Sequence, residues 1–474
     1  MFPHYPKLLL FTALTLLTAA PASAQQEIND VNTPLHLMKP SYDTPYSIPT
    51  KEGVKAKMDQ VLSFLETAMP AETDGDNLKQ GSLRLTSYEI GVLYAASADA
   101  GISTGDSRYS HFAADRLSLI AETAQRIKSK VEKNPAAYPQ LRKVCVPGAL
   151  DDAGAMCSAY IRWILNSKVK ASKDVDAVIR NYFTYVHDKQ YRLKDGIFAR
   201  IRPHYNTVWL DDMYMGVPCL AWYGAYLKQN EKTLAEGDRY ISEAVEQIHL
   251  FKDRMWVPEK KLFRHGWVEE MNPHPAFHWG RANGWAILTM CEVLDAIGND
   301  ASGSHATERA FVLDLLRQHI EGLCQLQDKT GLWHQLLDRP DTYLETSATA
   351  IYTYCIAHAI CEGWIDAEAY GAQTLLAWNA VASKINAKGQ VEGTCVGSGM
   401  GFDAAFYSYR PVHVMAAHGY GPAVWAGSEV IRLLGATHPK MNDSAIHFYP
   451  TEQTTSEPIF SEKRTGVADE KVIW

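Results

Sequence analysis

Two pairs of adjacent aspartates stand where a helix is expected to begin. Asp211 and Asp212 lie in W-L-D-D-M-Y-M, directly after Trp209, and Asp151 and Asp152 lie in A-L-D-D-A-G-A-M. Acids in a first turn interact favourably with the helix dipole, so a structural role accounts for such pairs. A carboxyl held near aromatic rings can instead acquire a raised pKa and act as general acid, then base. The pairs predict carboxylates on opposite sides of a groove, although spacing does not establish that they face each other.

Arginine, histidine and tryptophan gather between residues 263 and 285. The segment F-R-H-G-W contains His265, and H-W-G-R-A-N-G-W contains Arg281 and Trp285, which share one helix face if the helix begins this early. An arginine can pair with a carboxylate while a tryptophan stacks on the ring that bears it. Each residue alone would more often be structural, but their density predicts a site for such a ring.

Two later segments carry further polar candidates. G-L-W-H-Q contains His334, and E-T-S-A-T-A contains Thr346, in a stretch that is also typical of a helix N-cap. The run G-T-C-V-G-S-G at 393–399 lacks the lysine and the spacing of a phosphate-binding loop. We expect it to form a tight backbone turn near the groove.

Apolar residues recur at the helical period through nearly the whole chain. Pro218 should kink or interrupt the helix that begins near Asp211. Four glycines follow periodic segments as C-terminal caps would: Gly101, Gly298, Gly363 and Gly435. The expected helices cover residues 53–67, 86–99, 108–133, 151–165, 173–187, 211–229, 233–251, 282–298, 305–325, 347–362, 366–385 and 421–436.

Twelve helices with few alternating strands indicate an all-α fold. No βαβ alternation and no fixed-period repeat is found, which disfavours a helical solenoid. The remaining all-α architecture for a chain of this size is a closed toroid of six helical hairpins, an (α/α)6 barrel. We expect one catalytic domain over residues 51–474, with its groove built from long loops at one end.

The composition fits a large globular enzyme. Apolar residues make up 46% of the chain and charged residues 21%. The net charge of −8 argues against a nucleic-acid partner, which usually requires a basic patch. It does not favour an acidic ligand either, so binding of uronates must depend on a few local arginines and histidines.

The first residues have the pattern of a secretory signal. Lys7 precedes an apolar run from Leu8 to Ala19, and A-S-A at 22–24 matches a signal peptidase site. We expect residues 1–24 to be removed, residues 25–50 to form a polar lead segment, and the protein to be exported to the periplasm, with release from the cell as the alternative. No later stretch predicts a transmembrane helix.

The eight cysteines raise the question of disulfides in an exported protein. Most fall inside apolar helical patterns, which predicts buried free thiols. Cys145 with Cys157 is the one disulfide candidate. No cysteine or histidine spacing suggests zinc, and we expect neither a metal nor an organic cofactor.

Four segments taken together resemble a known family. W-L-D-D-M-Y-M, H-W-G-R-A-N-G-W, E-T-S-A-T-A and G-T-C-V-G-S-G, in this order, are similar to the unsaturated rhamnogalacturonyl hydrolases of glycoside hydrolase family 105. The unsaturated glucuronyl hydrolases of family 88 share their fold and mechanism. The resemblance spans roughly residues 88–434 and implies an (α/α)6 barrel, in agreement with the helix count.

The resemblance also implies a reaction. The substrate is an oligosaccharide that ends in a 4,5-unsaturated uronic acid left by a lyase. An aspartate protonates C4, water adds at C5, and the resulting hemiketal opens and expels the rest of the chain. Only one acid/base carboxylate is needed, unlike the pair of ordinary glycosidases.

By match to the family motifs, Asp211 would be the acid/base, and Asp152 would hold the sugar hydroxyls and the catalytic water. His265, Arg281 and Trp285 would bind the uronyl group. The sequence does not decide which aspartate of each pair is functional, so Asp151 and Asp212 also stay candidates for substrate contact. The other expected substrate contacts are Trp209, His334 and Thr346.

The alternative functions also involve carbohydrates. A sister specificity would cleave unsaturated glucuronyl units from ulvan or glycosaminoglycan fragments. A polysaccharide lyase or a non-catalytic glycan-binding toroid could use the same fold. The sequence leaves open which sugar follows the unsaturated residue and the oligomeric state.

Overall fold

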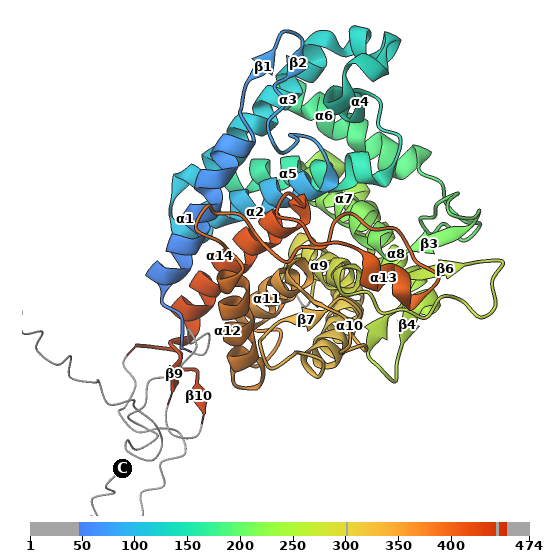
Figure 1. Ribbon diagram of the computed structural model, residues 1–474. Coiled ribbons are helices and arrows are strands. Elements are labelled where there is room, and N and C mark those ends of the chain that lie inside the picture. The colour runs from blue at the N-terminus through green and yellow to red at the C-terminus, as the bar shows by residue number, and fades with distance from the viewer. Residues whose placement is uncertain (1–46, 300–301, 442–444, 453–474) are drawn as a thin grey trace, which may run out of the picture. The chain divides into compact units, whose positions relative to one another are not determined.

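The computed structural model describes residues 47–299, 302–441 and 445–452, all of which belong to one compact unit, residues 45–474 (Figure 1). The predicted signal peptide, residues 1–24, and most of the predicted lead segment lie outside the described residues.

Twelve long helices form two concentric rings, which confirms the all-α prediction. The inner helices are α2 (Tyr88–Thr104), α5 (Leu150–Ser167), α7 (Asp211–Leu227), α9 (Gly280–Ile297), α11 (Thr346–Cys361) and α14 (Tyr420–Thr437). The outer helices are α1 (Lys51–Ala68), α3 (Ser107–Lys133), α6 (Lys173–Thr184), α8 (Leu234–Met255), α10 (Ala306–Cys324) and α12 (Ala367–Ser383).

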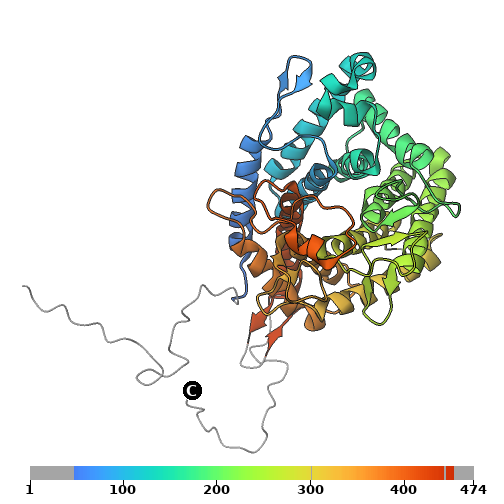
Figure 2. The same cartoon turned by 45° about the vertical axis from the view of Figure 1, so that its right-hand side comes forward.

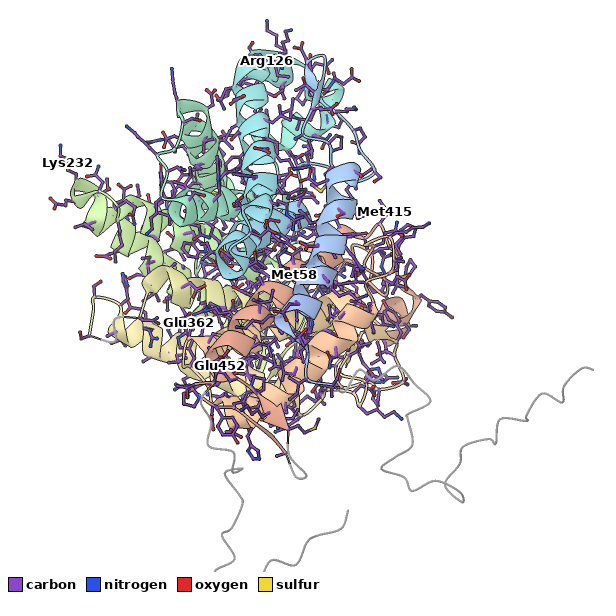
Figure 3. The ribbon with its side chains drawn as sticks, turned by 90° about the vertical axis from the view of Figure 1, so that its left-hand side faces the viewer. Met58, Arg126, Lys232, Glu362, Met415 and Glu452 are labelled. Carbon is purple, nitrogen blue, oxygen red and sulfur yellow. The ribbon has the colours of Figure 1, made fainter. Side chains whose placement is uncertain are left out.

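The inner ring is closed. Each inner helix contacts the next in the order α2, α5, α7, α9, α11, α14, and α14 contacts α2 again (Figure 2). The first outer helix seals the ring against the last inner one, because α1 packs on α14. A Cβ on Gly427 of α14 would lie 2.6 Å from Cγ of Met58 on α1, which is labelled in Figure 3.

The sequence explains which helices lie inside. Every residue of α11 from Thr346 to Ile360 is buried, since this helix is apolar or small on all faces. Helix α3 instead buries one stripe that recurs at helical spacing, including Phe112, Leu117, Ile120 and Ile127, and exposes charged residues elsewhere.

The inner helices run in the same direction. At each end of the barrel, contacts join residues that lie equally far along their own helices, as parallel helices require. Residues at their N-termini meet at one end, which we call the mouth. The connections that enter inner helices are the long ones, and all reach the mouth: residues 69–87, 134–149, 185–210, 256–279, 325–345 and 384–419.

The opposite end of the inner ring is filled by a cluster of charged and aromatic side chains. Arg162 forms an ion pair with Glu292 at 2.9 Å, and His358 bonds to Asp295 at 2.9 Å and to Glu429 at 3.1 Å. Burial raises the pKa of Glu292 to about 7, although Arg162 opposes the shift. Every inner helix contributes to this far-end cluster: Asp99, Arg162, Trp222, Glu292, Asp295, His358, Glu429 and Trp425.

The strands are two or three residues long and pair antiparallel in the loops. The pair that matters for the site is β3 (Thr207–Trp209) with β6 (Gly266–Val268), in which Trp209 lies opposite Gly266. The other pairs are β1 (Thr73–Asp74) with β2 (Asn77–Leu78), β4 (Trp256–Val257) with β5 (Leu262–Phe263), β7 (Trp333–His334) with β8 (Leu344–Glu345), and β9 (Lys440–Met441) with β10 (Ile446–His447).

Some predicted details were wrong. Gly101 and Gly435 do not end helices: α2 continues to Thr104 and α14 to Thr437. A Cβ on Gly101 would lie 2.9 Å from the Cβ of Ser110 on α3, so this glycine serves helix packing rather than capping. Pro218 does not interrupt α7, whereas Gly298 does cap α9. Gly363 directly follows the end of α11 with a positive φ, as predicted.

Two short helices escaped prediction, α4 (Pro139–Cys145) and α13 (Ala404–Tyr409). Each is too short to show a period in the sequence. All eight cysteines are free thiols, so the alternative of a Cys145–Cys157 disulfide is wrong. None of the described helices is long and apolar enough to cross a membrane.

Helices α5 and α7 meet at Gly154. A Cβ there would lie 1.6 Å from the carbonyl oxygen of Met215, a separation at which the backbone itself must shift. Gly154 stands two residues after Asp152, and Met215 stands four residues after Asp211. This close approach therefore sets the distance between the two aspartate pairs.

We expect Gly154→Ala to lower the free energy of unfolding by about 1–3 kcal/mol, the usual cost of overpacking a well-packed interior. Urea denaturation measures the change. Gly435→Ala is the matched control, because its Cβ would meet only the flexible end of Lys51 and alanine favours a helix. Equal midpoints for the two variants would mean that α5 and α7 do not meet at Gly154.

Candidate active site

Asp211 is the first residue of α7 and lies at the mouth. The pairing of β3 with β6 and the hydrogen bond from the Leu210 amide to the His265 carbonyl (2.9 Å) bring it beside His265. Nε2 of His265 is 2.8 Å from Oδ2 of Asp211. The Asp211 side chain is 13% exposed and the His265 side chain 1%, so only the carboxyl can reach a ligand.

Tyr407 of α13 fixes the imidazole from the other side. Its hydroxyl is 2.7 Å from Nδ1 of His265 and accepts the amide hydrogen of Gly401 at 3.0 Å. With that amide as donor, the hydroxyl can give its own hydrogen to Nδ1 of a neutral imidazole. Nε2 then carries the ring hydrogen and donates it to Asp211.

Asp212 points away from Asp211 and into an ion-paired triad. Arg200 bonds Asp212 with its Nη2 and Nε (2.6 and 2.9 Å) and Asp151 with Nη2 at 2.9 Å. The guanidinium also lies 4.3 Å from the ring centre of Trp209. Asp212 is fully buried and both its oxygens contact Arg200, so it is closed to a ligand in this arrangement.

The two neighbouring aspartates differ in pKa. Burial raises the pKa of Asp212 to about 6 and outweighs the opposing effect of Arg200. Burial also acts to raise the pKa of Asp211, but His265, followed by Arg200 and Arg281, holds it below its ordinary value. The prediction of a raised pKa at the acid/base carboxyl is therefore wrong for Asp211 in the free protein.

Accessibility still favours Asp211 as the proton donor. A donor must touch the substrate, and among this pair only Asp211 has an open carboxyl. An anionic ligand beside Asp211 would add negative charge and exclude water, and both effects raise a carboxyl pKa. The free protein thus holds Asp211 ionised, and binding of an anion promotes its protonation.

Asp152 lies in the first turn of α5, the inner helix next to α7. Its Oδ2 accepts the Gly148 amide hydrogen at 3.1 Å. Lys143 and Arg142 of α4 approach its two oxygens at 3.5 and 3.6 Å. These contacts fix the Asp152 carboxyl in place, which suits a group that orients hydroxyls or a water molecule.

Arg281 lies beneath the glycine-rich segment. It donates from Nη1 to the carbonyl of Cys395 and from Nη2 to that of Val396, both at 2.7 Å. Glu345 accepts the Cys395 amide hydrogen at 2.8 Å and stands 3.8 Å from Arg281. The Arg281 side chain is 1% exposed, so its direct contact with a uronate stays a prediction, while its position as a support for residues 393–399 is observed.

Trp285 is also buried and supports the mouth from below. It stacks on Tyr214, with ring centres 5.0 Å apart, and meets the edge of Tyr88. The Tyr88 hydroxyl is 2.5 Å from Nε2 of His418. Burial raises the pKa of Tyr88 well above its ordinary value, and the carboxylates of Glu89, Asp151 and Asp211 act in the same direction.

The last two predicted substrate contacts are His334 and Thr346. His334 contacts the carbonyl of Thr342 at 2.5 Å and Asp328 at 3.8 Å, and among the described residues no hydrogen bond or ion pair joins its ring to either aspartate pair. Thr346 is fully buried, and its amide bonds to the carbonyl of Gly393 at 3.0 Å. Both predicted substrate contacts remain predictions.

Two cavities open at the mouth. One, of about 340 Å³, is lined by residues that include Tyr88, Glu89, Gly397 and His418. The other, of about 350 Å³, is lined by Tyr185, Arg200, Arg202 and Asp212, among others. The mixture of aromatic rings with a few charged groups is typical of a site for a polar ring such as a sugar.

A family model described as Glycosyl Hydrolase Family 88 matches residues 63–434, which is most of the sequence. The chain belongs to this family. The resemblance drawn from the four segments is confirmed at the level of the related families 105 and 88.

Two relatives are similar in sequence to part of this chain. The "Unsaturated rhamnogalacturonyl hydrolase YesR" of Bacillus subtilis is 30% identical over 200 residues, which cover 42% of this chain and 54% of that protein. The "Unsaturated 3S-rhamnoglycuronyl hydrolase" of Formosa agariphila is 28% identical over 230 residues, which cover 48% of this chain and 58% of the relative. The matches thus span little more than half the length of these relatives.

Solved structures share the fold. A crystal structure described as a possible member of GH105 family from Salmonella enterica superposes with a TM-score of 0.63 at 20% identity. The alignment covers 84% of this chain and 97% of that one. At this identity the likeness establishes the toroid and leaves the substrate open.

Several residues at the site were not predicted. Arg200 and Tyr407 make the hydrogen bonds that orient Asp212 and His265, and Glu345 anchors the glycine-rich segment. Arg200 does stand in the R-I-R run shortly before W-L-D-D, a signal that could have been used. Tyr407 lies in an unpredicted helix, 142 residues from its partner, and no local pattern points to it.

We expect Tyr407→Phe to raise the pKa of Asp211, because the imidazole loses the hydroxyl that fixes its tautomer. An acid must start protonated, so kcat/KM falls as pH rises through its pKa. In the variant this descending limb should move to higher pH, and kcat should fall about fivefold for the loss of one neutral hydrogen bond. The pH profile of turnover measures both effects.

Tyr409→Phe is the control, since Tyr409 lies on the same short helix but is 86% exposed. Its profile should match that of the wild type. A Tyr407→Phe profile that also coincided with the wild type would exclude Tyr407 from control of Asp211.

Proposed function

We propose that the protein is an unsaturated uronyl hydrolase that removes a terminal 4,5-unsaturated uronic acid of the galacturonyl type from lyase-generated pectin oligosaccharides. The observation that carries the proposal is the open Asp211 carboxyl, bonded to His265 and lying on the inner helix next to the one that bears Asp152. The names of the two relatives, an unsaturated rhamnogalacturonyl hydrolase and an unsaturated 3S-rhamnoglycuronyl hydrolase, support the same reaction class.

In the proposed mechanism, Asp211 donates its proton to C4 of the enol ether. Water adds at C5 and loses a proton to the Asp211 carboxylate, while Asp152 orients that water and the sugar hydroxyls. The product is a hemiketal, which opens and releases the remaining chain. His265 donates to Asp211 and stabilises its ionised form after the first step.

The specificity has one favoured alternative. The Formosa agariphila relative is named for a rhamnoglycuronyl substrate, so cleavage of unsaturated glucuronyl units from ulvan or glycosaminoglycan fragments is the second candidate. A lyase would need a base that abstracts a proton rather than an acid that gives one, and a non-catalytic toroid would bind the same sugars without turnover.

Asp211→Asn should lower turnover of a lyase-digested rhamnogalacturonan by roughly 100- to 10,000-fold, the usual contribution of a general acid–base group. The loss of ultraviolet absorbance from the conjugated uronate measures hydration. Because Asp211 makes few contacts, the fold should survive, and circular dichroism checks this.

Asp212→Asn is the matched control, because Asp212 is the adjacent carboxyl. It should weaken the contact with Arg200 and lower the midpoint of unfolding, yet retain more activity than Asp211→Asn. The reverse order of activities would assign the acid to Asp212. Rising absorbance on undigested polymer would instead identify a lyase.

We also propose export to the periplasm by cleavage after Ala24, since A-S-A precedes that position. N-terminal sequencing of protein from the periplasmic fraction should begin at Gln25. Recovery of an intact Met1 terminus from the cytoplasm would contradict this proposal.

A further inference from the structure

A third cavity at the mouth is lined by basic side chains. It has a volume of about 350 Å³ and lies between the segment that enters α2 and the short helix α4. Its charged lining residues are Arg84, Arg142 and Lys143, and no carboxylate is among the residues that line it. We call it the basic cavity.

The walls of the basic cavity are held by buried hydrogen bonds. Oε1 of Gln140 accepts the amide hydrogen of Leu85 at 2.6 Å, and the Thr86 hydroxyl donates to the Gln140 carbonyl at 3.0 Å. Asn181 of α6 donates to the Val144 carbonyl at 2.7 Å. Both walls, and therefore the roots of the three cations, are fixed relative to each other.

Positive charge in the basic cavity exceeds the negative charge beside it. Arg142 and Lys143 share one carboxylate, Asp152, at 3.6 and 3.5 Å, which is beyond ordinary hydrogen-bond length. Arg84 has no carboxylate partner within the described ranges of the chain. The buried carboxyl of Glu89 also interacts electrostatically with Lys143, so three cations face two carboxyl groups in a protein of net charge −8, and neighbouring like charges repel unless an anion joins them.

Helix electrostatics explain only part of this arrangement. Arg142 and Lys143 occupy the last turn of α4, where basic residues are favoured by the dipole. Arg84 belongs to a different segment and gains nothing from that helix. A ligand role for Arg84 also fits the state of Arg281, which is 1% exposed and already donates to two backbone carbonyls, so Arg84 offers the more accessible guanidinium.

We infer that the basic cavity binds an anionic group of the oligosaccharide, a carboxylate or a sulfate ester. The inference rests on the proposed function. A sugar ring held by Asp152 lies one side chain away from Lys143 and Arg142, and an arginine fork such as that of Arg84 pairs readily with planar or tetrahedral oxyanions. The anion belongs either to the unsaturated terminal ring or to the sugar that follows it.

The test uses Arg84→Gln, because Arg84 is exposed and does not touch Asp152. Two unsaturated uronyl disaccharides serve as substrates, one with a neutral second sugar and one with a sulfate or carboxylate on it. We expect kcat/KM at low salt to fall about fivefold for the charged disaccharide, the upper range for a partly exposed ion pair. Added salt should reduce this difference.

Arg239→Gln is the control, since Arg239 is 68% exposed on the outer helix α8 and lies far along the chain from the mouth segments. It should leave kcat/KM unchanged for both disaccharides. A fall confined to the charged disaccharide assigns the anion to the second sugar, and an equal fall on both assigns it to the terminal carboxylate. No fall on either overturns the inference.

The outcome for the wild-type protein separates this inference from the proposed function. If the wild type hydrates neither disaccharide, the proposed function fails. Calorimetric binding of the same disaccharides to wild type and Arg84→Gln then tests the basic cavity by itself, and equal affinities would overturn it.

Discussion

One buried cation, Arg200, holds the N-terminal ends of two neighbouring inner helices together. It bonds Asp212 at the start of α7 and Asp151 at the start of α5, so each aspartate pair gives one member to the same guanidinium. Adjacent carboxylates on the two helices would otherwise repel. The other members do not bind Arg200: Asp211 bonds to His265, and Asp152 accepts from the Gly148 amide, and the geometry of the site depends on this division.

This division, in which one aspartate of each pair binds Arg200 and the other does not, gives a reason for two adjacent aspartates at the start of each helix. Asp212 is fully buried, and its pKa of about 6 reflects a desolvation that Arg200 only partly offsets. Removing one partner from a buried ion pair commonly costs about 3–5 kcal/mol, because the remaining charge is left uncompensated. In the α7 pair, Asp212 is buried against Arg200 while Asp211 keeps 13% of its side chain exposed, so anchoring and access are divided between two residues.

The sequence was sufficient to predict the twelve long helices, because burial on one or all faces leaves a periodic trace over three or more turns. It was insufficient for α4 and α13, which have two turns or fewer, and for Gly101, where tight packing on α3 looks like a helix end. At the site, the aspartate pairs and the cluster around Arg281 were found from residue types. The relay from Tyr407 through His265 was not, since it joins positions that only the closed ring brings together.

The far-end cluster determines how a polymer can use the barrel. Asp99, Arg162, Glu292 and His358 fill the inner ring at the end opposite the mouth, and their ion pairs cross from helix to helix. The barrel is therefore blind-ended, and a polysaccharide cannot thread through it. A ligand reaches Asp211 from the mouth and leaves by the same opening. Under the proposed function, this architecture would suit an enzyme that removes one unit per encounter.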